Sequence, residues 1–256
     1  MATKKRVSES RKARSMGGSP RRKATGASAA PEFSPGNSFP IVGVGASAGG
    51  LEALSSFLKA LPARTGMAVV VVQHLAPEHE SALTQLLSKA TAMPVLEVSD
   101  GMALQRNHVY VIPPNKSMTI QDGALKLVPR ERATIPHHPI DEFCAALARE
   151  QKAAAIGVIL SGSGSDGTLG LRAIKSEGGV TFVQDPKTAA WPAMPSSAIS
   201  AGVVDFVLPP AGIAAELARI SRHPYLLKER GGARRRWSGE DLRASPVRHR
   251  RGFPSL

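Results

Sequence analysis

The most informative segment of the sequence is residues 39–50, which read FPIVGVGASAGG. The apolar run that ends at Val44 is typical of a buried strand, and the small residues after it are typical of a sharp turn into a helix. Ser47 stands in that turn within a G-x-S-x-G pattern, whose glycines allow a strained backbone that exposes the serine hydroxyl. A helix starting behind the serine offers N–H groups to a developing oxyanion. The stretch therefore predicts a nucleophile.

The same stretch fits two other interpretations. Residues 43–48 also read G-x-G-x-x-A, which is the fingerprint of a dinucleotide-binding turn. Alternatively, the glycines only let a helix pack closely on a strand. From this segment alone the three interpretations stay open.

Beyond this stretch, short apolar runs alternate with amphipathic segments through residues 39–220. The runs indicate strands buried on both faces, at Ile41–Gly45, Met67–Gln73, Val109–Ile112, Ala155–Leu160, Val180–Val183 and Val204–Leu208. The amphipathic segments indicate helices, at Leu51–Leu61, Ser81–Ala90, Ile140–Lys152, Leu169–Glu177, Ser196–Ala201 and Gly212–Ile220. The alternation predicts an α/β fold with a doubly wound, mostly parallel sheet flanked by helices. Asp122-Gly123 between two short apolar runs adds an antiparallel hairpin near 116–128.

The positive charge of the chain is concentrated at its two ends. The net charge is +13, yet residues 39–220 contain fourteen basic and fifteen acidic side chains. Residues 1–38 and 221–256 each contribute +7 among Ser, Gly, Pro and Ala, with little apolar material to bury. We therefore expect disordered basic tails, which attract a polyanion such as nucleic acid or an anionic membrane surface, or only keep the chain in solution.

Several classes of protein are excluded by what the sequence lacks. A single cysteine, Cys144, permits no intrachain disulfide, and its place in an apolar-periodic segment indicates a core residue. No apolar run reaches the eighteen residues of a membrane span, and no apolar segment follows the basic start as in a signal peptide. We expect a cytoplasmic protein.

Three chemically reactive residues follow three of the predicted strands. Ligands of a doubly wound sheet bind beyond the carboxyl ends of its strands. Ser47 follows the first strand, His74 the second, and Asp166 lies in the Gly-rich loop after Ala155–Leu160. Together they predict a nucleophile, a general base and an orienting carboxylate.

Each of these residues also has a structural alternative. Ser47 and Asp166 fit as N-caps of the helices that follow them, and His74 as a hydrogen-bonded residue at a strand end. The dinucleotide alternative is weakened because the second strand ends in Gln73-His74, where an acidic residue is expected. Trp191 and Met194 either line a pocket or pack beneath a loop.

Five ordered motifs resemble the catalytic domain of the chemotaxis protein-glutamate methylesterases. The resemblance spans nearly all of residues 39–220 and is carried by residues 41–50, Val72–Leu75, Val109–Pro114, Gly157–Gly167, and Gln184–Pro186 with Met194-Pro195. Leu75–Ser81 and Pro139–Phe143 are more similar to the version found in methylesterase–methyltransferase fusion proteins.

This resemblance implies hydrolysis of γ-glutamyl methyl esters on receptor signalling helices, and in some members deamidation of glutamine, without metal or cofactor. It makes Ser47 the nucleophile, His74 the general base and acid, and Asp166 the group that orients His74. The oxyanion hole is expected at the amides after Ser47 and in the Gly162–Gly164 loop. No metal ligands are expected, since neither His74 with His79 nor His137-His138 has convincing spacing.

The resemblance is imperfect in two respects. Response-regulator members commonly have Met where this chain has Ser163, and Thr where it has Ala48, so the acyl pocket is expected to differ in shape. The tails contain no receiver or methyltransferase domain, so we expect regulation from outside residues 1–256. Two other functions compete with a stand-alone esterase: a catalytically silent binding module anchored to a polyanion by its basic tails, and a nucleotide-dependent oxidoreductase.

Overall fold

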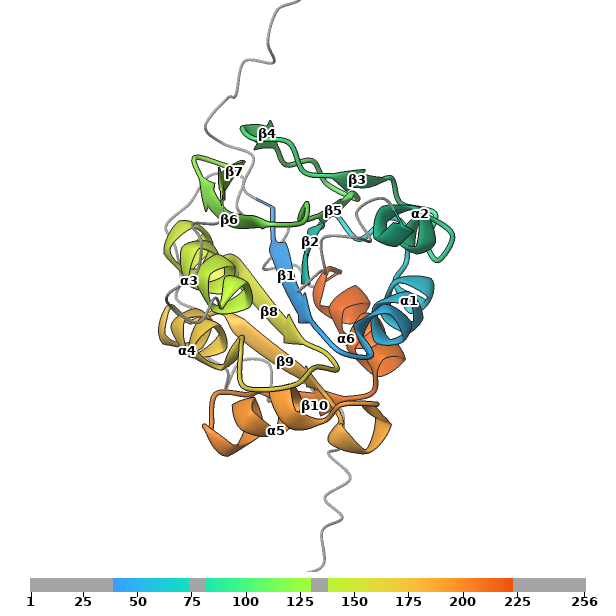
Figure 1. The fold of residues 1–256 in the computed structure, drawn as a ribbon, viewed down its shortest axis with the longest axis vertical. Helices are drawn as coiled ribbons and strands as arrows, with labels where there is room; N and C mark the ends of the chain where they lie inside the picture. The colour runs from blue at the N-terminus through green and yellow to red at the C-terminus, as the bar shows by residue number, and fades with distance from the viewer. Residues whose placement is uncertain (1–38, 74–81, 130–137, 223–256) are drawn as a thin grey trace, which may run out of the picture. The chain divides into compact units, whose positions relative to one another are not determined.

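The computed structural model describes residues 39–73, 82–129 and 138–222. His74 and the expected tails lie outside these ranges, apart from Ser221 and Arg222. The main sheet contains seven parallel strands: β1 (Ile41–Ala46), β2 (Ala68–Gln73), β3 (Val95–Glu97), β5 (Val109–Val111), β8 (Ala155–Ile159), β9 (Val180–Gln184) and β10 (Phe206–Leu208). Their order across the sheet is β10-β9-β8-β1-β2-β5-β3 (Figure 1). The prediction of a mostly parallel, doubly wound sheet is confirmed.

Helices cover both faces of this sheet. They are α1 (Gly50–Ala60), α2 (Ala82–Ser88), α3 (Pro139–Gln151), α4 (Thr168–Ser176), α5 (Ala193–Ser200) and α6 (Pro210–Ile220). Buried residues of α1, α2 and α6 form one hydrophobic cluster with the sheet, and those of α3, α4 and α5 form a second. The split follows from strand geometry, because successive side chains point to opposite faces.

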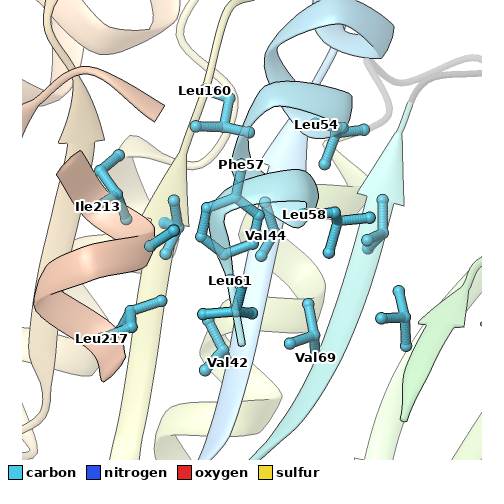
Figure 2. Packing of buried hydrophobic residues seen from close by; sticks show 14 of the residues in the cluster. Val42, Val44, Leu54, Phe57, Leu58, Leu61, Val69, Leu160, Ile213 and Leu217 are labelled. Carbon is cyan, nitrogen blue, oxygen red and sulfur yellow. The ribbon is translucent and has the colours of Figure 1, made fainter. Parts of the chain in front are cut away.

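Strand β1 illustrates this alternation. Val42 and Val44 pack with Phe57 of α1, whereas Ile41 belongs to the opposite cluster. Figure 2 shows Phe57 over Val44, with Ile213 and Leu217 of α6 on the neighbouring part of the sheet.

The glycines of β1 allow α3 to approach the sheet closely. A Cβ atom built on Gly45 would lie only 2.9 Å from the Ile159 Cδ1 atom and 3.0 Å from the Ile140 Cδ1 atom. A side chain at Gly43 would crowd Phe143 and Leu147 of α3. Close packing therefore explains these two glycines, whatever the chemistry of the turn that follows them.

A separate three-stranded antiparallel sheet has the order β4-β7-β6, with strands β4 (Met102–Ala103), β6 (Lys116–Gln121) and β7 (Ala124–Pro129). Asp122 and Gly123 join β6 and β7 with φ angles of 51° and 71°, as a type I′ turn requires. The Gly123 N–H group donates to the Glu150 carboxylate of α3 over 3.0 Å. The hairpin prediction is confirmed, whereas β3 and β4 were not expected.

Proline accounts for two helix starts that were predicted too late. We expected α5 to begin at Ser196, after Pro195, but it begins at Ala193. We expected α6 at Gly212, but it begins at Pro210. Proline is tolerated in the first helical turn, because N–H groups there need no partner within the helix.

Candidate active site

The topology places the candidate site next to the central strand. From β1 the chain first adds β2, β5 and β3 on one side of β1, and it later adds β8, β9 and β10 on the other side. The strand order thus reverses between β1 and β8, and such a switch point opens a crevice beyond the carboxyl ends of the strands. Ser47 follows β1 directly, and the loop of residues 160–167 follows β8.

The backbone around Ser47 makes a tight turn into α1. The N-cap of α1 is Gly49, whose φ of 67° is the left-handed conformation that glycine adopts readily. The Gly50 N–H group donates to the Ser47 carbonyl over 2.8 Å, and the Ser47 N–H group donates to the Ser161 carbonyl over 3.0 Å. The N-cap of α1 is Gly49 and not Ser47, so the interpretation of Ser47 as the N-cap of this helix is wrong.

Backbone donors at this turn are available for an anion. Within the described ranges, the N–H groups of Ala48 and Gly49 have no hydrogen-bond acceptor. The start of an α-helix favours negative charge. The Gly162 N–H group, in contrast, donates to the Trp191 carbonyl over 2.9 Å. Gly162 is therefore removed from the expected oxyanion donors, while the amides after Ser47 remain.

Asp166 is buried, with 4% of its surface exposed, and among the described residues three backbone N–H groups donate to its carboxylate. Its donors are the N–H groups of Ile140 at 3.1 Å, Asp141 at 2.9 Å and Gly167 at 2.8 Å. The N-cap of α4 is Gly167, so the structural alternative in which Asp166 is the N-cap of α4 is wrong. Asp166 instead caps α3, whose N-terminus stabilises the negative charge of the carboxylate.

The third predicted member of the site, His74, lies outside the described residues. The strand that leads to it is described: β2 ends at Gln73, which pairs in register with Ala46, the residue before Ser47. The Gln73 side chain carries no carboxylate for the ribose hydroxyls of a dinucleotide.

A group with the composition of a metal site lies at the start of α3. Ligand atoms of His138, Asp141 and Asp166 lie within 4.8 Å of one another, and the His138 Nδ1 atom is 3.9 Å from the Asp166 Oδ1 atom. Both carboxylates already accept backbone N–H groups, Asp141 that of Gly170 over 2.7 Å. Because backbone N–H groups already donate to these carboxylates, the arrangement favours helix capping over cation binding.

Two further residues complete the surroundings of Ser47: Ser161, to which sequence reasoning gave no role, and Trp191, for which it left two interpretations open. Ser161 is 1% exposed and hydrogen-bonds to the Ser47 turn. Trp191 is 54% exposed and lies against that turn, since a Cβ atom on Gly49 would be 3.1 Å from the Trp191 Cδ1 atom. Met194 is fully buried, and Gly162 leaves space for its sulfur atom. The only sequence signal for Ser161 was its position directly after a strand.

Cys144 is a core residue, as predicted. It is 1% exposed on α3, and burial raises the pKa of its thiol far above the usual range, with Asp141 and Asp166 raising it further. A thiol in this state is not a nucleophile.

The sequence of this fold matches a known protein family. The family model described as CheB methylesterase matches residues 42–217, which include all of β1 except Ile41, the Ser47 turn and the Asp166 loop. The chain belongs to the CheB methylesterase family.

Curated CheB relatives are about one-third identical to this chain. A putative protein-glutamate methylesterase/protein-glutamine glutaminase from Leptospira interrogans is 35% identical over 181 residues, which are 70% of this chain and 94% of that protein. The Geobacter sulfurreducens protein-glutamate methylesterase/protein-glutamine glutaminase 1 is 34% identical over 71% of this chain and 52% of its own length. The chain thus spans about half the length of some CheB relatives. In an uncharacterized 104.1 kDa protein of Rhodobacter capsulatus, the matched region is 13% of the length at 41% identity.

The fold agrees with the same family. The Thermotoga maritima CheB methylesterase catalytic domain superposes with a TM-score of 0.66 and 30% sequence identity, over 72% of this chain and all of that domain. Among the residues described here, no helix combines the length and the apolar character needed to cross a membrane.

Proposed function

We propose that residues 39–220 hydrolyse γ-methyl esters of glutamate side chains on chemoreceptor-type signalling proteins, and deamidate glutamine at the same site. One observation carries the proposal: Ser47 and Asp166 follow the adjacent strands β1 and β8 at the switch point of a CheB-family fold. The proposed reaction takes place in the cytoplasm and needs no cofactor.

Each residue has one proposed role. Ser47 attacks the ester carbonyl, and His74 takes the hydroxyl proton and returns it to the departing methoxide. Asp166 orients His74 and stabilises its positive charge. A water molecule that His74 activates then cleaves the acyl-enzyme, so the products are methanol, the glutamate carboxylate and the original Ser47 hydroxyl.

The N–H groups at the start of α1 are suited to the oxyanion of this reaction. Those of Ala48 and Gly49 directly follow the nucleophile and have no acceptor among the described residues. Donors held in place before the reaction stabilise the developing charge without reorganisation.

The test is methanol release from a methyl-esterified receptor cytoplasmic fragment. The intact chain is compared with Ser47→Ala and with Ser176→Ala, a control at the exposed end of α4. Release by the intact chain and the control, but not by Ser47→Ala, supports the proposal. Undiminished release by Ser47→Ala contradicts it. No release by any folded form favours the silent binding module, which would be retained on a polyanion in a salt-dependent manner.

A further inference from the structure

Ser161 connects three segments of the candidate site through hydrogen bonds. Its N–H group donates to the Gln184 Oε1 atom over 2.9 Å, and its carbonyl accepts the Ser47 N–H group over 3.0 Å. Its hydroxyl donates to the Ala48 carbonyl over 2.9 Å and accepts the Trp191 N–H group over 3.0 Å. Every polar group of this buried residue is thus satisfied.

These contacts hold the nucleophile turn on both sides of Ser47. The Ser161 carbonyl fixes the Ser47 N–H group, and the Ser161 hydroxyl fixes the carbonyl of the next residue, Ala48. A further backbone hydrogen bond of the turn runs from the Gly50 N–H group to the Ser47 carbonyl. Gly49, the N-cap of α1, has no side chain that could restrain this turn, and among the described residues the Ser161 hydroxyl does so through the Ala48 carbonyl.

Gln184 anchors Ser161 to the sheet. It ends β9, is 2% exposed, and its Nε2 atom donates to the Thr188 carbonyl over 3.0 Å. A continuous path of hydrogen bonds therefore runs from β9 through Ser161 to Ser47. A group fixed by a packed strand holds a reactive side chain more precisely than a loop does.

We propose that Ser161 is a positioning residue for Ser47, and that its hydroxyl fixes the nucleophile turn against the Trp191 segment. Ser161 acts through the backbone and does not touch the substrate. The inference rests on the proposed function, because it gives Ser161 a role in the reaction of Ser47. A displacement of about 1 Å costs a reaction about a hundredfold, so this restraint has a measurable effect on rate.

The decisive variant is Ser161→Ala, which keeps both backbone hydrogen bonds and removes both hydroxyl bonds. We expect its kcat for methanol release to fall by about tenfold to a hundredfold, with a smaller change in KM. Ser161→Thr retains the hydroxyl and restores most of the kcat. This rescue is the result that a loss of packing alone would not give.

Thr181→Val is the matched control. Thr181 is also fully buried, and its hydroxyl likewise has two backbone partners, donating to the Val203 carbonyl over 2.8 Å and accepting the Asp205 N–H group over 3.1 Å. It lies near the other end of β9 from Gln184. We expect both variants to lower the Tm, but only Ser161→Ala to lower kcat. An unchanged kcat in Ser161→Ala, or an equal loss in Thr181→Val, overturns the inference.

Amide hydrogen exchange separates this inference from the proposed function. In Ser161→Ala, the N–H groups of Ser47 and Trp191 are expected to exchange faster than in the intact chain, whereas the N–H groups of β9 are unchanged. If the intact chain releases no methanol, the proposed function fails and exchange still decides the positioning role. Unchanged exchange at both amides overturns it.

Discussion

Asp141 and Asp166 cap each other's helices. The Asp166 carboxylate accepts the Asp141 N–H group at the start of α3, and the Asp141 carboxylate accepts the Gly170 N–H group at the start of α4. Asp166, which is proposed to orient His74, thus also helps to hold α3 and α4 together. Its substitution therefore affects folding as well as catalysis.

Asp166→Ala should lower the free energy of unfolding by about 2–3 kcal/mol, because it leaves the buried N–H groups of Ile140, Asp141 and Gly167 without acceptors. Urea denaturation measures this loss. The control is Asp185→Ala, which removes one exposed hydrogen bond to the Lys187 N–H group and should cost about 0.5–1 kcal/mol. An equal loss of unfolding free energy in the two variants would show that Asp166 does not stabilise the contact between α3 and α4.

Asp141→Asn should become more stable relative to the unsubstituted chain as the pH rises. Burial raises the pKa of Asp141 above its usual range, and the neighbouring Asp166 charge raises it further, although the Gly170 hydrogen bond opposes this. Below about pH 4, Asp141 is protonated in both the folded and the unfolded chain, so its charge costs nothing. As the pH rises through the raised pKa, the folded state must take up a disfavoured charge, and stability is lost.

The asparagine variant keeps an oxygen acceptor for the Gly170 N–H group without carrying that charge. Urea denaturation between pH 4 and 7.5 should therefore show the stability difference growing from pH 4 and then levelling off. A difference that is constant or shrinks over this range contradicts the raised pKa.

Cys144 should resist alkylation as long as the chain is folded. Its thiol is buried and its pKa is far above the usual range, so iodoacetamide reaches a thiolate only after unfolding. We expect the reaction at pH 8 to be about a hundredfold or more slower in buffer than in concentrated urea. The sequence contains one cysteine, so total thiol modification reports this site directly. Rapid labelling in buffer would mean that α3 opens locally.

Trp191→Ala should weaken the binding of a protein substrate. The ring is 54% exposed beside the Ser47 turn, while both polar groups of its backbone are held by Ser161 and Gly162. A rigid exposed aromatic side chain provides contact area at small entropic cost. We expect the KM of an esterified receptor fragment to rise by about threefold to tenfold, with kcat little changed.

The control for this substitution is Val128→Ala, which truncates a similarly exposed apolar side chain on β7. It should leave both kinetic constants unchanged. A loss of kcat without a rise in KM in Trp191→Ala would assign the ring to the chemistry instead of to substrate binding.

Local sequence patterns predicted the main sheet because each of its long strands is a mostly apolar run, as a strand buried on both faces should be. The hairpin was predictable because Asp122 and Gly123 are suited to positive φ angles. Strand β3 was missed because it has only three residues, of which two are exposed, and shows no apolar pattern.

Contacts between distant residues could not be predicted in the same way. The structural alternative for Asp166 was a cap of the helix that follows it, but Asp166 caps α3, which lies 25 residues earlier in the chain at Asp141. The Ser161 hydroxyl meets the Ala48 carbonyl across 113 residues. No spacing in the sequence encodes such pairs, since they exist only once β1 and β8 are adjacent.

The packing of α1 against α6 joins the beginning of the described fold to its end. These are the first and last helices of the described fold, and both contribute to the hydrophobic cluster on one face of the sheet (Figure 2). The hydrophobic cluster on this face is thereby closed by segments from both ends of residues 39–220. A module of this kind can be transferred between longer proteins during evolution, because joining new segments to its ends leaves its interior intact.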